Sequence, residues 1–187
     1  MKNRKQLLRQ IILASLLAAM TTVLTYYIKI PTQNGYLHIG DSIIYVAACL
    51  LPTPLAMLCG ALGGAFADLL GGYTMYALPS LIIKALLALS FDSRQKKIVS
   101  KRNAFASVIG AVITAAGYYL AEAVIITFSS AADFSQFKNI IMSPVPWGAS
   151  LYTLPGNLVQ AAASAAVFLI LGTALDKAKI KQRIINH

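Results

Sequence analysis

The chain has 187 residues, of which 58% are apolar and only 12% charged, and its mean hydropathy is +0.69. A soluble domain carries about 25% charged residues, so this composition excludes an ordinary water-facing surface. The net charge of +10 is concentrated in three clusters at 1–10, 94–102 and 177–183, which hold thirteen of the sixteen basic residues. Basic clusters between long apolar stretches follow the positive-inside rule, so we expect a multi-pass membrane protein without a nucleic-acid partner.

Apolar runs predict an all-α integral membrane fold with six transmembrane helices in one domain, residues 1–187. The first run follows a basic stretch, as in a signal peptide, but it continues to Ile28 without a clean cleavage site, so we expect a retained helix. A more polar stretch at 129–148 contains two prolines and Trp147. The six expected helices are 7–28, 39–51, 55–70, 78–91, 104–128 and 151–175.

The second, third and fourth runs are shorter than the roughly 20 residues that a spanning helix needs. Joining 39–51 to 55–70 as one kinked span would give five helices. Six crossings instead place the N-terminus, the 92–103 loop and the C-terminal tail on one side. Because that side carries most of the basic residues, we expect six helices with both termini in the cytoplasm of a bacterial cell.

Catalytic and metal-binding signatures are absent from the sequence. Cys49 and Cys59 both lie in apolar runs, which favours two packed thiols over a disulfide framework or a metal site. No zinc-protease, phosphate-loop or serine-hydrolase motif occurs. We therefore expect no cofactor and no enzymatic activity. The Gly60–Gly64 pair has the GxxxG spacing of close helix packing.

Asp68, Lys84 and Glu122 fall inside predicted spans, where charge is costly and often functional. At 1.5 Å per residue, Lys84 and Glu122 each lie about 9 Å from the external ends of their helices, and Asn157 lies at the same level. Gln160 lies one turn deeper. The hypothesis is a polar ligand pocket open to the outside; the alternative is a structural Lys84–Glu122 ion pair. Further candidates near this face are His38, Asp41, Asp68, Tyr73, Tyr76 and Trp147.

Four segments together resemble the substrate-binding S components of energy-coupling factor (ECF) vitamin transporters. They are 36–41 (YLHIGD), 60–73 (GALGGAFADLLGGY), 81–84 (LIIK) and 154–160 (LPGNLVQ). The resemblance implies an external pocket built from helices four to six and the loop between helices one and two. It also implies a scaffold transmembrane subunit and two ATP-binding subunits as partners. Ala14 and Ala18 match the family's Ala-xxx-Ala motif, which docks the scaffold, so we expect this pair on the helix exterior.

The substrate is left open by the sequence. Both a lysine and a glutamate in the expected pocket suit a neutral or zwitterionic ligand, and the aromatic side chains suit ring stacking. This favours a pyridine- or pyrimidine-type vitamin or precursor over riboflavin or a corrinoid such as cobalamin. Two alternative functions are an integral-membrane enzyme acting on a lipid-linked substrate and a structural membrane protein.

Overall fold

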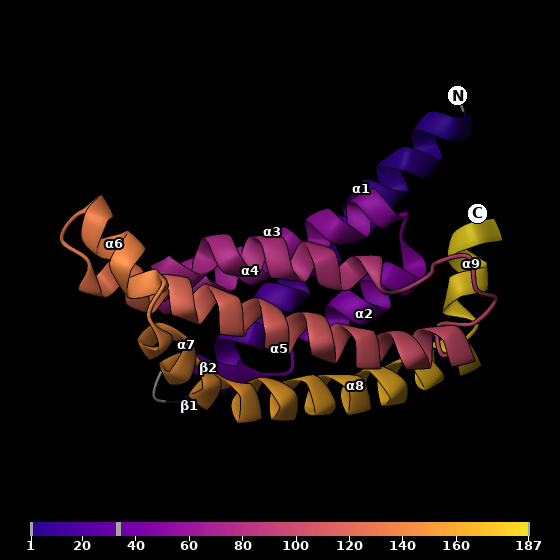
Figure 1. The fold of residues 1–187 in the computed structure, drawn as a ribbon. Coiled ribbons are helices and arrows are strands. Elements are labelled where there is room, and N and C mark those ends of the chain that lie inside the picture. The colour runs from indigo at the N-terminus through magenta and orange to yellow at the C-terminus, as the bar shows by residue number, and fades with distance from the viewer. Residues whose placement is uncertain (1, 33–34, 187) are drawn as a thin grey trace.

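The computed structural model describes residues 2–32 and 35–186, and almost all of them are helical (Figure 1). Six helices make up the body of the molecule, and shorter elements connect or extend them. The six are α1 (Lys2–Tyr27), α2 (Asp41–Leu50), α3 (Thr53–Gly71), α4 (Thr74–Leu89), α5 (Lys101–Ser130) and α8 (Leu154–Lys177). The others are β1 (Lys29–Thr32), β2 (Gly35–His38), α6 (Phe134–Ile141), α7 (Pro144–Ser150), the 3-10 turn η1 (Leu151–Thr153) and α9 (Ile180–Asn186).

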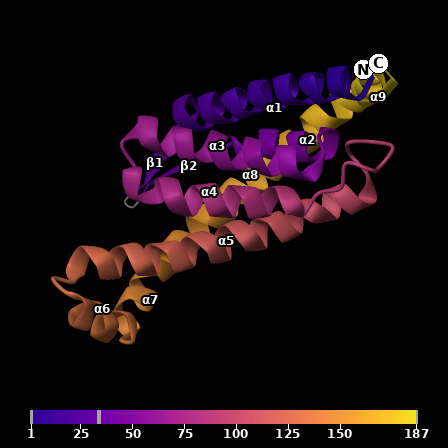
Figure 2. The same cartoon turned by 90° about the horizontal axis from the view of Figure 1, so that it is seen from above.

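The long helices lie side by side as an elongated bundle whose two ends differ. In both Figures 1 and 2, α1 begins and α9 ends at the same end of the bundle, next to the loop between α4 and α5. The β1–β2 hairpin, α6 and α7 lie at the opposite end. The three basic clusters therefore share one end of the molecule. This is the arrangement that six crossings would produce.

Four of the helical segments are long and apolar enough to cross a membrane: 4–27, 53–71, 101–130 and 144–177. Many large apolar side chains on them face outward, Leu16 of α1, Phe66 of α3 and Ile170 of α8 among them. The helices α2 and α4 are apolar but shorter. Such an outer surface is suited to lipid, so the protein is an integral membrane protein with several apolar helices.

The expected all-α fold is wrong in one detail, because a two-stranded antiparallel hairpin follows α1. Lys29 pairs with His38, and Ile30 with Leu37. No strand was predicted between the first two apolar runs; residues 33 and 34 lie outside the described residues. The Asn34-Gly35 dipeptide in the sequence is a turn signal that could have indicated a hairpin here, but not its register, because Gly35 pairs with Thr32 as part of β2.

The alternative of one kinked span from 39 to 70 is not what the chain adopts. Leu51 has an extended backbone and ends α2, and Pro52 precedes the first turn of α3. A proline disfavours helical geometry in the residue before it, which explains the break. The polar stretch 129–148 also differs from expectation, because it contains the short helices α6 and α7.

Glycines of α3 allow α1 and α4 to pack closely on its two sides. A Cβ at Gly60 would lie 2.6 Å from the backbone oxygen of Lys84, and one at Gly64 would lie 2.8 Å from the Lys84 Cγ. On the other side, a Cβ at Gly63 would lie 2.7 Å from the Thr21 Cβ of α1. The GxxxG motif therefore places Lys84 deep in the bundle.

The basic loop between α4 and α5 is fixed against the end of α8. The Asp176 carboxylate accepts hydrogen bonds from the backbone N–H groups of Ile98 and Val99, at 2.8 and 2.9 Å. The fully buried Asn103 side chain accepts from the Asp92 N–H and donates to the Ile98 carbonyl. This network holds two basic clusters together at one end of the bundle.

The Ala14–Ala18 pair does not lie on the helix exterior, where the sequence analysis placed it. Ala14 is 8% exposed and belongs to the core, and Ala18 packs against that core beside Gly63. The next residues around the helix, Ser15 and Ala19, are exposed. The outward-facing pair of small residues on α1 is therefore Ser15 and Ala19.

Candidate functional site: a tyrosine-lined cavity

A cavity of about 330 Å³ is lined by residues of the hairpin and of the adjoining helix ends. These elements lie at the end of the bundle opposite the termini (Figure 1). The cavity has the size of a pocket for a small organic molecule. It is lined by residues of β2, α3, the α3–α4 turn, α4, α5, η1 and α8. The lining residues are Tyr36, Leu37, His38, Asp68, Tyr73, Tyr76, Tyr118, Glu122, Tyr152, Thr153, Gly156, Asn157 and Gln160.

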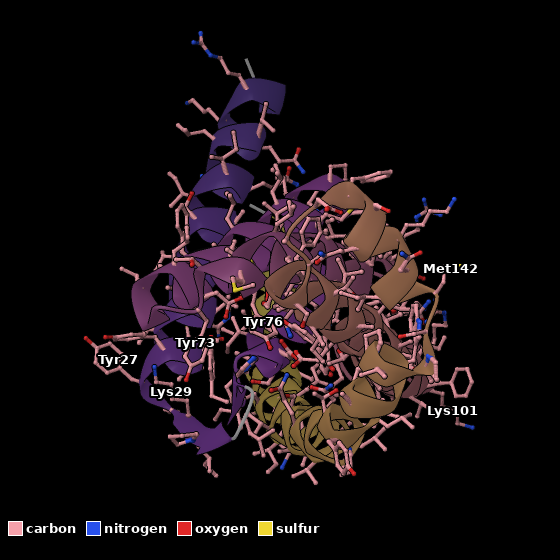
Figure 3. The ribbon with its side chains drawn as sticks, turned by 60° about the vertical axis from the view of Figure 1, so that its left-hand side comes forward. Tyr27, Lys29, Tyr73, Tyr76, Lys101 and Met142 are labelled. Carbon is pink, nitrogen blue, oxygen red and sulfur yellow. The ribbon has the colours of Figure 1, made fainter. Side chains whose placement is uncertain are left out.

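Tyrosines form much of the cavity wall. The Tyr36 and Tyr73 ring centroids lie 4.8 Å apart, and the Tyr73 and Tyr76 centroids 6.5 Å apart. Gly72 ends α3 in the left-handed conformation, with φ of 80°, and this turn carries the chain directly into Tyr73. Figure 3 views this end: Lys29 lies close to Tyr73, Tyr76 lies nearer the middle, and Tyr27 points away. Flat, polarisable walls of this kind suit an aromatic ring.

Lys29 holds the hairpin against the tyrosines. Its Nζ lies 4.6, 5.2 and 5.9 Å from the ring centroids of Tyr26, Tyr36 and Tyr73. These are cation–π distances. The ammonium group therefore ties β1 to the end of α1 and to the α3–α4 turn at the edge of the cavity.

Each carboxylate in the cavity accepts a tyrosine hydroxyl. Tyr36 donates to the Asp68 Oδ1 at 2.6 Å, and Tyr76 donates to the Glu122 Oε2. Burial, together with the nearby Asp68 charge, raises the pKa of Tyr36, so its hydroxyl remains a donor. Among the described lining residues there is no lysine or arginine. The described lining therefore presents negative and neutral groups, with the Lys29 ammonium at the edge of the cavity.

Two amides on α8 add neutral hydrogen-bonding groups. Asn157 and Gln160 both line the cavity and, being three residues apart, share one helix face. The Asn157 Nδ2 is buried, and within the described part of the chain it has no hydrogen-bond partner. A buried donor of this kind is costly unless something satisfies it, and a bound ligand would do so.

Lys84 and Asp41 form a buried ion pair beneath the cavity. The Lys84 Nζ lies 2.7 Å from Oδ1 and 2.9 Å from Oδ2 of Asp41, and the two residues are 1% and 0% exposed. The predicted alternative of a Lys84–Glu122 ion pair is wrong, because the short β2–α2 connection brings Asp41 to Lys84 while Glu122 bonds Tyr76. Neither Lys84 nor Asp41 lines the cavity; Gln160 connects it to them through a 3.3 Å hydrogen bond to Asp41.

His38 closes the cavity from the hairpin side. It is 8% exposed, and its Nδ1 accepts a hydrogen bond from the Gly40 N–H at 3.1 Å. Burial lowers the pKa of His38 from 6.5 to about 4, so the ring is neutral at ordinary pH. Because Nδ1 accepts, the neutral ring carries its proton on Nε2.

Seven of the ten predicted ligand residues thus line one cavity, and three do not. Trp147 lies outside the lining: its Nε1 donates to the Ile141 carbonyl at 2.8 Å, and its ring contacts Tyr119. Sequence analysis missed several lining residues, Tyr118 in particular. Tyr118 stands four residues before Glu122, and that spacing on one helix was an available signal. The other missed residues are Tyr36, Leu37, Tyr152, Thr153 and Gly156.

The fold and the cavity define a helical membrane protein that presents a small-molecule pocket at one end. The chain matches the family model of the ECF-type riboflavin transporter, S component, over residues 5–177. It belongs to this family, and it is therefore a substrate-binding subunit of an ECF-type transporter rather than an enzyme. The resemblance noted in the sequence is confirmed.

A comparison with curated proteins finds one relative of similar size. The chain is 28% identical over 129 residues to an uncharacterised protein from the gap 3′ region of Pyrococcus woesei. The alignment covers 68% of this chain and 85% of the relative.

Proposed function

We propose that this S component captures an uncharged, flat heteroaromatic vitamin in the tyrosine-lined cavity, with riboflavin as the first candidate. The observation that carries the proposal is the cavity itself, where aromatic walls meet the amides of Asn157 and Gln160. The rings would stack on the vitamin, and the amides would fix its orientation. The family description, which names riboflavin, supports this choice.

The charges of the cavity argue against an anionic ligand. Asp68 and Glu122 would repel a phosphate or pyrophosphate group, and Lys84 is already neutralised by Asp41. Placing two like charges close together in a dry site costs several kcal/mol (about 4 kcal/mol at 4 Å and an effective dielectric constant of 20). These charges support a ligand without negative charge, as the proposed uncharged vitamin is.

A pyridine- or pyrimidine-type vitamin is the second candidate, and it was the one that the sequence alone favoured. Such a ring would stack on the same tyrosines and bond the same amides. It is smaller than the three-ring system of riboflavin and would leave more of the 330 Å³ cavity to water. A corrinoid is far larger than either, and it would require the cavity to open.

The cavity would face the outside of the cell. The positive-inside rule assigns the end with the basic clusters to the cytoplasm, and the hairpin end to the exterior. In this topology six helices cross the membrane, although α2, with 10 residues, is only about 15 Å long. The hairpin and Asp41 would then lie within the bundle on the external side of α2. Reporter tags after residue 187 and at 94–102 should read cytoplasmic, and a tag at Ser135 external.

Transport would require a scaffold transmembrane subunit and two ATP-binding subunits, as is general for S components. We place the scaffold contact on the exposed face of α1 that contains Ser15 and Ala19, rather than on Ala14 and Ala18. Small exposed residues four apart allow a second helix to approach closely. Exposed apolar neighbours such as Ile12 and Leu16 would extend the contact.

The test is uptake of riboflavin by vesicles that contain the reconstituted complex and internal ATP. Wild type should accumulate the vitamin, whereas Ser15→Leu/Ala19→Leu should lose copurification with the scaffold and uptake but keep ligand binding. Leu7→Ala, which changes an exposed residue earlier on α1, is the control. Uptake of a pyridine or pyrimidine vitamin instead of riboflavin would favour the second candidate.

A further inference from the structure

The buried ion pair below the cavity also fixes the direction of an amide inside it. Asp41 Oδ2 accepts hydrogen bonds from the Lys84 ammonium at 2.9 Å and from the Gln160 Nε2 at 3.3 Å, and the same ammonium lies 2.7 Å from Oδ1 as an ion pair. Lys84 and Asp41 are at most 1% exposed, and Gln160 is 3% exposed. The three groups therefore form a dry cluster whose geometry water cannot easily rearrange.

An ionised carboxylate accepts hydrogen bonds and donates none. Gln160 must therefore turn its NH₂ group toward Asp41, and its Oε1 is directed away from that carboxylate. Within the described part of the chain this oxygen accepts no hydrogen bond, and Gln160 lines the cavity. The Lys84 ammonium stabilises Asp41 as an ionised carboxylate, which can only accept hydrogen bonds. Lys84 therefore fixes the orientation of the Gln160 amide through Asp41.

The neighbouring amide offers the complementary group. Asn157 lies one turn nearer the start of α8 on the same face, and its buried Nδ2 lacks a partner among the described residues. The cavity wall thus carries an acceptor at Gln160 and a donor at Asn157. These two groups match a ligand edge on which an N–H donor stands next to a carbonyl acceptor.

We propose that Gln160 and Asn157 recognise a lactam- or imide-type edge of the ligand, and that Asp41 and Lys84 are positioning residues that fix the Gln160 amide for this contact. The inference rests on the proposed function and adds to it which edge of the bound ring faces α8. The N–H would donate to the Gln160 Oε1, and the adjacent carbonyl would accept from the Asn157 Nδ2.

The experiment compares the affinities of the purified protein for riboflavin and for 3-methylriboflavin, whose ring N–H is replaced by N–CH₃. Wild type should bind the methylated flavin about ten- to a hundredfold more weakly, because the Gln160 oxygen loses its donor and meets a methyl group. In Gln160→Met this ratio should fall to about threefold or less. The control Gln182→Met, at an exposed position of α9, should keep the wild-type ratio.

The positioning role is tested by Asp41→Leu/Lys84→Met, which replaces the pair by apolar side chains of similar size. The ratio of the two affinities should again collapse to about threefold, because the freed amide can present its NH₂ group. A merely structural pair would leave the ratio unchanged. Should this variant fail to fold, Gln160→Met still tests the inference. A wild-type affinity ratio in Gln160→Met, or equal affinities of the wild-type protein for the two flavins, would overturn this inference and leave the proposed function standing. No binding of riboflavin by wild type would contradict the proposed ligand as well.

Discussion

Asp41 and Lys84 are joined by two short contacts, 2.7 and 2.9 Å, although they lie 43 positions apart in the chain and neither is exposed to solvent. The pair links the start of α2 to the middle of α4. The Lys84 Nζ also lies 5.1 Å from the centre of the Tyr118 ring on α5. One ion pair thus connects three helices immediately beneath the tyrosine-lined cavity.

Removing one member of this pair should destabilise the fold strongly. Lys84→Met leaves the Asp41 charge buried without its counterion, which typically costs about 3–5 kcal/mol. The double variant Asp41→Leu/Lys84→Met should recover most of that loss, because it removes both charges. Thermal unfolding in detergent, followed by near-ultraviolet circular dichroism, measures the effect. A double variant less stable than Lys84→Met would contradict this account.

Close packing of α3 on α4 should make Gly60 intolerant of a methyl group. A Cβ there would meet the Lys84 backbone oxygen at 2.6 Å, and backbone cannot move aside as a side chain can. We expect Gly60→Ala to destabilise the protein by about 1–3 kcal/mol. Gly148→Ala is the matched control, since nothing lies within 4 Å of its added Cβ. Equal unfolding temperatures for the two variants would refute the packing role of Gly60.

Tyr73 should contribute to binding, whereas Tyr27 should not. Tyr73 lines the cavity, while Tyr27 is 75% exposed and points away from it (Figure 3). Loss of a stacking ring in Tyr73→Leu should weaken affinity about tenfold or more. Tyr27→Leu should leave it within about twofold. Isothermal titration calorimetry of both variants with riboflavin makes the comparison. An unchanged affinity of Tyr73→Leu would show that the Tyr73 ring does not contact the ligand.

Stability should depend on pH through His38. Its pKa is about 4 in the folded protein and 6.5 in the unfolded chain, so the unfolded state binds the proton first as pH falls. The stabilisation is complete above pH 6.5 and is lost as pH drops toward 4, by about 3 kcal/mol in total. Denaturant unfolding of wild type and His38→Gln between pH 7.5 and 4.5 isolates this contribution. If the unfolding free energy depended on pH in the same way in both proteins, that would argue against a buried neutral His38.

Much of the helical framework could be predicted from the sequence, because long apolar runs and proline breaks act locally. The segment 104–128 became α5, and Pro52 ended α2 as expected. The hairpin was missed because its strands are only four residues long and follow directly on α1.

The site was predictable in part. Counting residues from the helix ends predicted that Glu122 and Asn157 lie at one level, and both line the cavity. Both stand a similar number of turns from the same end of the bundle. The same counting could not show which carboxylate meets Lys84, since that depends on how closely α3 and α4 approach and on the path of the chain after the hairpin. It also could not show which side of α1 faces the core, and Ala14 was therefore placed on the exterior.

Mass spectrometry of small molecules released from the purified protein would identify what the cavity binds in the cell. Wild type purified from cells grown with the vitamin should release an uncharged heteroaromatic compound, riboflavin first, in about equimolar amount. The cavity variant Tyr73→Leu should release much less, and Tyr27→Leu should match wild type. Release of an anionic or lipid-linked molecule, or equal release by the Tyr73 variant, would contradict the account of this cavity as the vitamin site.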